Sequence, residues 1–257
     1  MRYYMTSLPD YKNDPEAYEI EERSRPDEML MLEVAGEMAI ESLENIHNVA
    51  VLDLCCGTGL SLERIINHPN ISCAVGVDIC QPYLDFAKIK YKQHRLKPTF
   101  ILGDAVSVRL PREQWDVIML ASAYHHIEHE RKVEFLNRVH YLLDNSGYAI
   151  IAENVLPEYE ESNTKEYAHA VKQFYTEVLN TAKQQNPNLP DYVANLIKRV
   201  AQYGYDGDYE YKVSLSLLLK DLAKARLQIV TQKRVWPKDE SKLGKTGGNY
   251  VFKVCCL

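Results

Sequence analysis

The sequence contains no uninterrupted run of about eighteen apolar residues, the length that a membrane-spanning helix requires. Its first residues, Met1–Met5, also lack the apolar segment of a secretory signal peptide. We therefore expect a cytoplasmic protein with no membrane partner.

Positively charged residues are also fewer than negatively charged ones. Lys and Arg together number 30 against 36 Asp and Glu, which gives a net charge of −6 at pH 7. Nucleic-acid-binding surfaces draw most of their affinity from clustered Lys and Arg, so we expect no nucleic-acid partner. A chain of 257 residues, 46% of them hydrophobic, is long enough for one sizeable core or one domain with a large insertion.

Cysteine pairs of the C-x-x-C type are absent, although the chain has six cysteines. Five of the six fall in or beside predicted buried strands. This distribution is typical of reduced, packed thiols in a cytosolic protein, and it argues against a disulfide framework or a zinc site.

What the sequence does contain is a strand followed by a glycine turn, Val51-Leu-Asp-Leu-Cys-Cys-Gly-Thr-Gly59. A carboxylate, Asp53, lies within the apolar run, and a helical pattern follows the turn from Leu60. Such a strand–turn–helix unit can bring bare backbone N–H groups close to a nucleotide-like ligand. Taken alone it is a weak signal, because many α/β folds use glycine only to turn tightly.

Strand and helix patterns alternate over most of the chain, which indicates βαβ units and a mostly parallel sheet. Helices are predicted from Asp27, as the N-cap, to about Leu43, and at 60–67, 82–94, 129–143 and 214–226. Strands are predicted at 49–54, 72–78, 99–102, 115–121, 148–153, 227–235 and 249–255.

The alternation stops after Glu153. Residues 158–202 have the pattern of two helices separated at 186–190, and a tyrosine-rich loop follows at 203–211. The last two strands are too close in sequence for a helical crossover, so they should pair antiparallel. We expect an N-terminal cap segment (1–47), a cofactor-binding core (48–157), a helical cap insertion (158–212) and a core completion with a C-terminal hairpin (213–257).

Two further acids follow strand ends. Asp78 ends the second predicted strand, 21 positions beyond Gly57. An acid about twenty residues past a glycine turn is placed to accept hydrogen bonds from ribose hydroxyls, although it could also cap the helix at Pro82. Asp104 follows the third strand, where a carboxylate can accept from an exocyclic amine. An ordinary turn would explain Asp104 equally well.

With these residues in place, the chain resembles the class I S-adenosylmethionine-dependent methyltransferases over about residues 49–155. The resemblance implies an α/β, Rossmann-like, doubly wound seven-stranded sheet, mostly parallel with a last antiparallel strand, here with a helical cap insertion. It implies S-adenosyl-L-methionine as the cofactor, with the turn from Asp53 to Gly59 around the methionine part. Asp78 would hold the ribose, and Asp104 with Ala105 would contact adenine. The resemblance also implies Cys55, Gly57, Ile79 and Ser122 as further cofactor-binding residues.

The chain departs from the family at one position. Cys55 stands where the D-x-G-x-G-x-G pattern has its first glycine, which suggests a slightly less permissive turn. A dinucleotide oxidoreductase would prefer a full G-x-G-x-x-G, but position 62 is Leu. The pattern therefore favours methyl transfer.

The fourth strand ends in Tyr124-His-His126, and its carboxyl end should face the transferable methyl group. We take His125 or His126 as a candidate general base, because imidazole titrates near neutrality. Tyr124 could shape the pocket or hydrogen-bond the nucleophile. A packing role against the cofactor is the alternative for the histidines. His125, His126 and His129 also form H-H-x-x-H, but neither a carboxylate to orient these imidazoles nor a fixed third ligand is evident, so we expect no metal.

Tyrosines concentrate outside the predicted sheet. Four of the 18 lie in residues 1–27 and eight lie in 159–211. Amphipathic rings suit a lid around a small aromatic or cationic ligand, but they could equally pack the insertion onto the core.

These patterns predict a cytoplasmic methyltransferase, monomer or homodimer, acting on an O, N or C atom of a small-molecule methyl acceptor. A nucleic-acid base methyltransferase would show [D/N]-P-P-[Y/F] where this chain has Ala121-Ser-Ala-Tyr124. A protein methyltransferase and a non-catalytic S-adenosylmethionine-binding regulatory module remain as alternatives.

Overall fold

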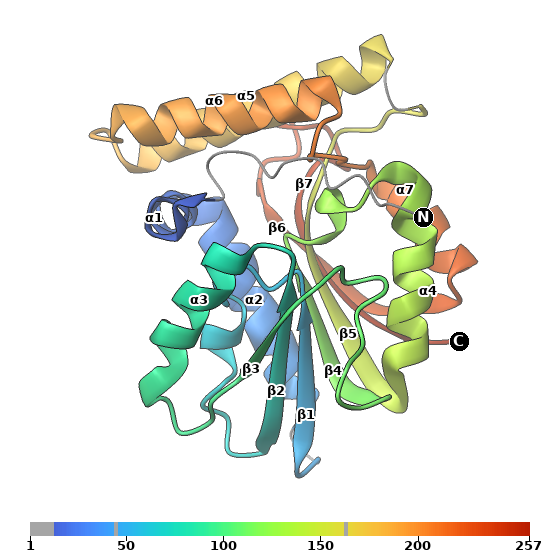
Figure 1. Ribbon diagram of the computed structural model, residues 1–257. Helices are drawn as coiled ribbons and strands as arrows, with labels where there is room; N and C mark the ends of the chain where they lie inside the picture. The colour runs from blue at the N-terminus through green and yellow to red at the C-terminus, as the bar shows by residue number, and fades with distance from the viewer. Residues whose placement is uncertain (1–12, 44–45, 162–163) are drawn as a thin grey trace, which may run out of the picture.

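The computed structural model describes residues 13–43, 46–161 and 164–257 (Figure 1). Three tyrosines of the predicted N-terminal cap segment, Tyr3, Tyr4 and Tyr11, lie outside these ranges. No helix within the ranges is both long and apolar enough to span a membrane. All six cysteines fall inside them and are free thiols.

The described residues form a seven-stranded sheet in the order β3-β2-β1-β4-β5-β7-β6. The strands β1 to β5 are parallel, and β7 runs antiparallel between β5 and β6. This confirms the predicted mostly parallel sheet whose last strand is antiparallel. The bounds are β1 Val49–Leu54, β2 Ile71–Asp78, β3 Thr99–Leu102, β4 Trp115–Ala121, β5 Leu143–Val155, β6 Leu227–Trp236 and β7 Gly248–Cys256.

Helices cover both faces of the sheet because alternate strand residues point to opposite faces. In β1, Leu52 and Leu54 pack in a core with the helices α4 (Lys132–Leu142) and α7 (Leu215–Lys224). Val49 and Val51 point the other way, into a core with α2 (Pro26–Glu41). The helix α3 (Gln81–Lys90) follows β2 and continues into the short 3-10 turn η3 (Tyr91–Gln93).

Several predicted helices differ from the structure. The helix α2 begins two residues early, with Arg25 at its N-cap and proline at its first position, so Asp27 lies inside the first turn. The predicted helix at 60–67 is wrong: only a 3-10 turn forms, η2 (Leu62–Arg64). The hydroxyl of Ser61 bonds Asp53 below it, and Pro69 disfavours helical conformation at His68.

Above the carboxyl ends of the parallel strands lie three more helices (Figure 1). They are α1 (Pro15–Arg23), α5 (Lys165–Gln185) and α6 (Asp191–Asp206). The last two run side by side and pack around Phe174, Val178 and Ile197. The helix α6 continues further than predicted and ends at Gly207, which caps it in the left-handed conformation.

The insertion that carries α5 and α6 leaves and rejoins the sheet at one place. The backbone N–H of Leu156 donates to the carbonyl of Val213 at 2.9 Å. Leu156 also bridges Ser214. The two ends of the insertion are therefore held beside each other at the end of β5.

Candidate active site

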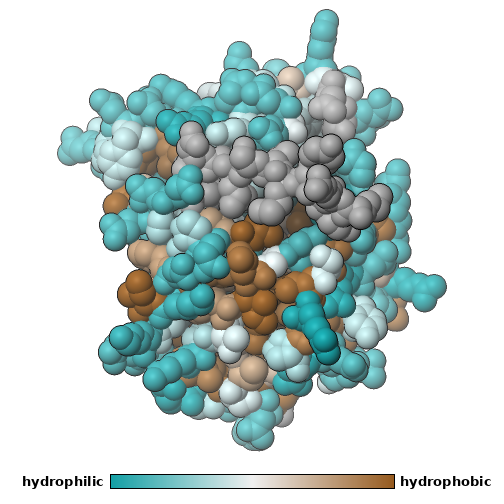
Figure 2. All heavy atoms as spheres, viewed as in Figure 1, coloured by the Kyte–Doolittle hydropathy of each residue, from teal (hydrophilic) through white to brown (hydrophobic). Residues whose placement is uncertain are grey.

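A cavity of about 500 Å³ lies at the carboxyl ends of β1, β2, β3 and β4. Between β1 and β4 the strand order reverses, and parallel α/β sheets bind ligands at such a switch point. Figure 2 shows apolar surface gathered near the centre of this face of the molecule. Ile79 and Leu102 are partly exposed apolar side chains on the cavity wall. The loops after four separate strands thus build one binding site.

The glycine turn after β1 forms one wall of this cavity. Cys55, Gly57 and Gly59 all have positive φ, at 57°, 53° and 79°. A Cβ at Gly59 would meet the ring of Tyr91 at 2.8 Å, so glycine is required there by space as well as by φ. Cys55 adopts the conformation of the glycine it replaces, so the turn keeps its shape at a cost in backbone strain.

Asp53 lies beneath the turn and not on the cavity surface. It is 1% exposed and accepts a very short hydrogen bond from Ser61 Oγ. Its other oxygen, Oδ1, has no hydrogen-bond partner among the described residues. Burial raises the pKa of Asp53 to about 7, against the opposing effect of the Ser61 hydrogen bond.

Asp78 reaches the cavity from the end of β2. Its Oδ2 accepts from the N–H of Gly57 at 2.8 Å, and its Oδ1 accepts from the N–H of Cys80 at 2.8 Å. The first bond joins the acid to the glycine turn that precedes it by 21 residues. Because each carboxylate oxygen has two lone pairs, Asp78 can still accept from hydroxyl groups of a ligand.

Asp104 and Ala105 line the cavity beyond β3. The Asp104 carboxylate accepts from the N–H of Val106 at 3.0 Å and from Arg131 Nη2 at 2.7 Å. Burial opposes ionisation of Asp104, but the bonds from Arg131 and Val106 outweigh it and lower the pKa of that carboxyl. Arg131, which the sequence analysis did not single out, therefore orients this acid.

Ser122 stands where the large cavity meets a second, smaller one of about 40 Å³. It has φ 49°, a second strained residue at the site, and its hydroxyl donates a very short bond to Glu28. Tyr18, Glu22 and His126 also line both cavities. The two cavities therefore adjoin at these four side chains.

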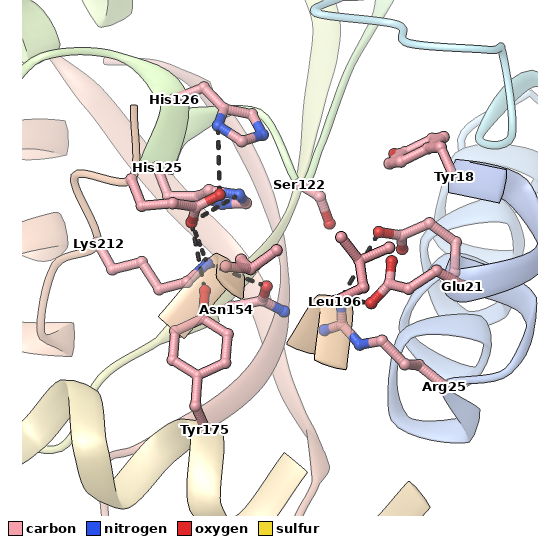
Figure 3. Close-up of a pocket in the computed structure, with 13 residues that line it drawn as sticks. Tyr18, Glu21, Arg25, Ser122, His125, His126, Asn154, Tyr175, Leu196 and Lys212 are labelled. Carbon is pink, nitrogen blue, oxygen red and sulfur yellow. Dashed lines mark hydrogen bonds and ion pairs between the residues drawn. The ribbon is translucent and has the colours of Figure 1, made fainter. Parts of the chain in front are cut away.

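The smaller cavity has two polar walls (Figure 3). One carries His125, His126, Lys212, Asn154 and Tyr175, and the other carries Tyr18, Glu21 and Arg25 from α1 and its end. Leu196, on α6, lies between the two walls. The N-terminal helix and the insertion thus enclose the space next to Ser122.

His125 is held from behind by Glu153 at the end of β5. The Nδ1 of His125 lies 2.5 Å from Glu153 Oε1, and its backbone N–H donates to Glu153 Oε2 at 3.1 Å. Burial of Glu153 opposes its ionisation, but the neighbouring His125 and Lys212 outweigh this and lower its pKa. His126 is less buried, and its ring lies tilted against that of Tyr209, with centroids 4.6 Å apart.

The structure places Tyr124 away from both cavities, which corrects the expectation that it shapes the pocket. Its side chain is 1% exposed, packs against Phe135, and donates its hydroxyl to Asp221 Oδ2 at 2.9 Å. His129 is likewise separate from the paired histidines and lies edge-on to Tyr167 and Tyr211. The H-H-x-x-H pattern is therefore not gathered at one point.

The tyrosines outside the sheet divide between two roles. Tyr18, Tyr175, Tyr209 and Tyr211 line the cavities. Tyr159 and Tyr167 are buried against each other, with ring centroids 5.0 Å apart, inside the insertion. The packing interpretation therefore holds for Tyr159 and Tyr167, while a lid role for the four rings that line the cavities stays a prediction.

Several polar residues at the smaller cavity escaped the sequence analysis. Arg25 lies within 3.6 Å of four carboxylates, which belong to Glu21, Glu22, Asp27 and Glu28. Burial, then repulsion from Glu21 and Glu28, raises the pKa of Glu22 well above its usual range. An acid inside a buried strand, as at Glu153, is a signal that could have been read. Glu210 and Lys212 carry no such signal because they reach the site only through the fold of the insertion.

The comparisons with known proteins agree with this geometry. The model of a methyltransferase domain family matches residues 51–147. An uncharacterised protein from Rickettsia prowazekii (strain Madrid E) is 27% identical over 142 residues, which are 53% of this chain and 54% of that protein. The chain thus spans about half the length of the curated relative that it matches.

Solved structures extend the likeness to most of the chain. An S-adenosylmethionine-dependent methyltransferase from Clostridium acetobutylicum has a TM-score of 0.60 at 15% identity, over 93% of this chain and 97% of that one. A geranyl diphosphate C-methyltransferase from Streptomyces coelicolor, solved with Mg²⁺, geranyl diphosphate and S-adenosyl-L-homocysteine, has a TM-score of 0.59 at 11% identity. That likeness covers 87% of this chain and 79% of the other.

The residues present fit S-adenosyl-L-methionine, the cofactor of these enzymes. The large cavity offers carboxylates at Asp78 and Asp104, a glycine turn, and apolar surface at Ile79 and Leu102. Such a donor set suits a ribose, an amine-bearing base and a chain with a charged end. Residues 51–147 therefore match the model of a methyltransferase domain, and the chain has the fold of the class I S-adenosylmethionine-dependent methyltransferases.

Proposed function

We propose that this chain transfers a methyl group to an oxygen, nitrogen or carbon atom of a small polar metabolite. The observation that carries the proposal is the junction of the two cavities at Tyr18, Ser122 and His126. A donor in the larger cavity and an acceptor in the smaller one would meet there. S-adenosyl-L-methionine, when bound, supplies a methyl group on a sulfonium that is already a good leaving group.

The chain's own residues would then supply alignment and exclusion of water. Asp78 and Asp104 would hold the two ends of the nucleoside, and the turn at Gly57 would fix the amino-acid part. The division by role follows the sequence analysis: core segments 48–157 and 213–257 for the donor, cap segments 1–47 and 158–212 for the acceptor.

A small acceptor is favoured by the size and walls of the second cavity. A volume of about 40 Å³ holds only a few non-hydrogen atoms. Both walls are polar, and α1 and the insertion close over them. A short polar group fits such a space better than a segment of a folded protein does.

His125 and His126 are the side chains that we propose to activate the acceptor. His126 borders both cavities, and Glu153 positions His125 through its Nδ1. Either imidazole could accept a proton from an acceptor hydroxyl or amine as the new bond forms. Tyr124 has no part in this proposal, because its hydroxyl is bonded to Asp221 in the core.

The test is incubation of the full chain with methyl-labelled S-adenosyl-L-methionine and a panel of small metabolites, followed by mass spectrometry of the products. We expect label on a small acceptor. Alanine at both His125 and His126 should reduce turnover about 100-fold or more while cofactor affinity stays within about twofold. Asp78→Ala should instead weaken cofactor binding about 10- to 100-fold, as measured by calorimetry.

Other outcomes would contradict the proposal in distinct ways. Label that appears only on added proteins would favour a protein methyltransferase. Cofactor binding without transfer to any acceptor would favour a regulatory module. Normal turnover in the variant with alanine at both histidine positions would show that the two imidazoles only pack at the site.

A further inference from the structure

His125, His126 and Glu210 bring three potential metal ligands together on one wall of the smaller cavity. The two histidines come from the 3-10 turn η4 (Tyr124–His126), and Glu210 comes from the segment after α6. One ligand atom from each residue lies within 4.8 Å of the other two. His125 and Glu210 are buried, and His126 is partly buried.

The spacing of these atoms suits a shared ion better than direct hydrogen bonds. His125 Nε2 lies 3.7 Å from Glu210 Oε2, and His126 Nδ1 lies 3.7 Å from Glu210 Oε1. Both distances exceed the length of a hydrogen bond between nitrogen and oxygen. Ligand atoms held tetrahedrally at zinc bond lengths of about 2.1 Å are separated by about 3.4 Å.

A histidine that binds a metal ion through one ring nitrogen is often oriented by a carboxylate at its other ring nitrogen. Glu153 supplies this carboxylate for His125. Its Oε1 lies 2.5 Å from His125 Nδ1, so the ring nitrogen that faces Glu210 is Nε2. A carboxylate that accepts from the far nitrogen fixes the tautomer and increases the basicity of a ligand histidine. For His126, ion binding would exchange the contact of Nδ1 with the Tyr209 carbonyl, at 3.1 Å, for a metal bond.

The balance of charge around the cavity also favours a cation. Glu153 and Glu210 face two lysines: Lys212, whose Nζ is 3.3 Å from Glu210 Oε2 and 3.3 Å from Asn154 Oδ1, and the buried Lys132, whose positive charge both carboxylates favour. On the opposite wall, Arg25 forms ion pairs with four carboxylates. A divalent ion would offset this excess of negative charge, and Lys212 would retain Asn154 as a partner.

We propose that His125, His126 and Glu210 bind a divalent transition-metal ion of the zinc type, with its open position toward the smaller cavity. Imidazole and carboxylate ligands in this combination suit such an ion. Binding of the ion stands apart from the proposed function. Its role does rest on that function: the open position would hold the acceptor's oxygen or nitrogen and lower the pKa of that group, so its proton would pass to solvent water, and the two histidines would act through the ion in place of accepting a proton.

The experiment uses the full, untagged chain after treatment with a chelator. Cobalt(II) is titrated into it and followed by calorimetry and by visible absorption of the ion, with zinc(II) as a competitor. We expect one tight site per chain. His126→Gln and Glu210→Gln should each weaken binding by tenfold or more, and Glu153→Gln by about tenfold through the orientation of His125.

His129→Gln is the matched control, because His129 belongs to the same H-H-x-x-H run but lies against Tyr167 and Tyr211. Its cobalt affinity should be unchanged. Each variant is first checked for cofactor binding, which reports that it is folded. The absence of a tight site in the unsubstituted chain, or an equal loss in the His129 variant, would overturn the proposal.

The same samples separate this proposal from the proposed function. Methyl transfer by a chain that binds no cobalt or zinc would end the metal proposal and leave the methyltransferase intact. Tight ion binding without methyl transfer to any acceptor would support the metal site and contradict the proposed function.

Discussion

Asp53 is an acid without access to solvent and with one oxygen unpaired among the described residues. Its pKa in the folded chain is about 7, compared with 3.8 for an exposed carboxyl. The folded state therefore binds more protons than the unfolded state between these two values. It follows that Asp53 costs stability progressively as pH rises from about 4 to about 7.

We expect Asp53→Asn to remove this part of the pH dependence. A difference of about three pKa units corresponds to at most about 4 kcal/mol of unfolding free energy at neutral pH. Urea unfolding across this pH window should therefore show a shallower decline for the variant than for the unsubstituted chain. Asp85→Asn, at an exposed acid, is the control and should leave the slope unchanged. Equal slopes in all three proteins would refute the assignment.

At the same scale, the sequence reveals residues of the large cavity better than residues of the smaller one. Gly57 and Asp78 follow strand ends at a spacing set by the βαβ unit, so their meeting through a hydrogen bond follows from local pattern. Glu210 meets His125 across 85 residues of chain through the insertion, and no local pattern encodes that approach. The strain at Cys55 lies between these cases, because the family pattern marks the position while the φ angle needs the structure.

Among the elements, the turn η4 is joined to the helices on one face of the sheet through Tyr124. The hydroxyl of Tyr124 bonds Asp221 on α7, and the Nζ of Lys132 on α4 bonds the Tyr124 carbonyl at 2.6 Å. These bonds connect the turn that carries both histidines to two helices on one face of the sheet. Tyr124 therefore supports the site from below.

Tyr124→Phe should lower the free energy of unfolding by about 1 to 3 kcal/mol, because a buried hydrogen bond to a carboxylate is lost. Denaturant unfolding measures this directly. Tyr141→Phe serves as the control, since the ring of Tyr141 is 60% exposed on α4 and should change stability little. An effect of the same size in both variants would contradict the role given to Tyr124.

The predicted elements match the structure where the apolar periodicity is continuous. They differ from it where side-chain hydrogen bonds hold the backbone in another conformation. The strands β1, β3 and β4 have the predicted bounds. The stretch at 60–67 also has helical periodicity, but Leu62, Ile65 and Ile66 reach the core from a tight turn anchored at Ser61. Periodicity indicates which residues are buried. Either an α-helix or a tight turn can bury Leu62, Ile65 and Ile66.

At the scale of the whole molecule, ion pairs hold α1 beside the large cavity, which Tyr18 and Glu22 help to line. Arg23 bonds Glu63 at 2.7 Å, and Lys90 bonds both Glu63, at 2.8 Å, and Glu19. These ion pairs connect α1 to η2 and α3. Tyr18 on α1 stacks on Tyr83 of α3 with centroids 4.8 Å apart, at the edge of the same cavity.

Lys90→Gln should release α1 and increase the rate of cofactor dissociation about two- to fivefold, as expected for partly exposed ion pairs. Hydrogen exchange of residues 15–23 should accelerate in the same variant. Lys88→Gln is the control, because Lys88 pairs with Asp85 on its own helix and both side chains are about half exposed. Unchanged exchange in α1 would show that the ion pairs do not hold it.

The joined ends of the insertion have a consequence for how such a chain can evolve. Because a backbone hydrogen bond joins Leu156 to Val213, the insertion is a closed loop that is attached to the sheet at one point. Doubling the length of a flexible closed loop costs only about 0.6 kcal/mol. Lineages could therefore exchange this module for a longer, shorter or unrelated one without shifting the register of β5. Under the proposed division of roles, the acceptor site could change in this way while the donor site stays the same.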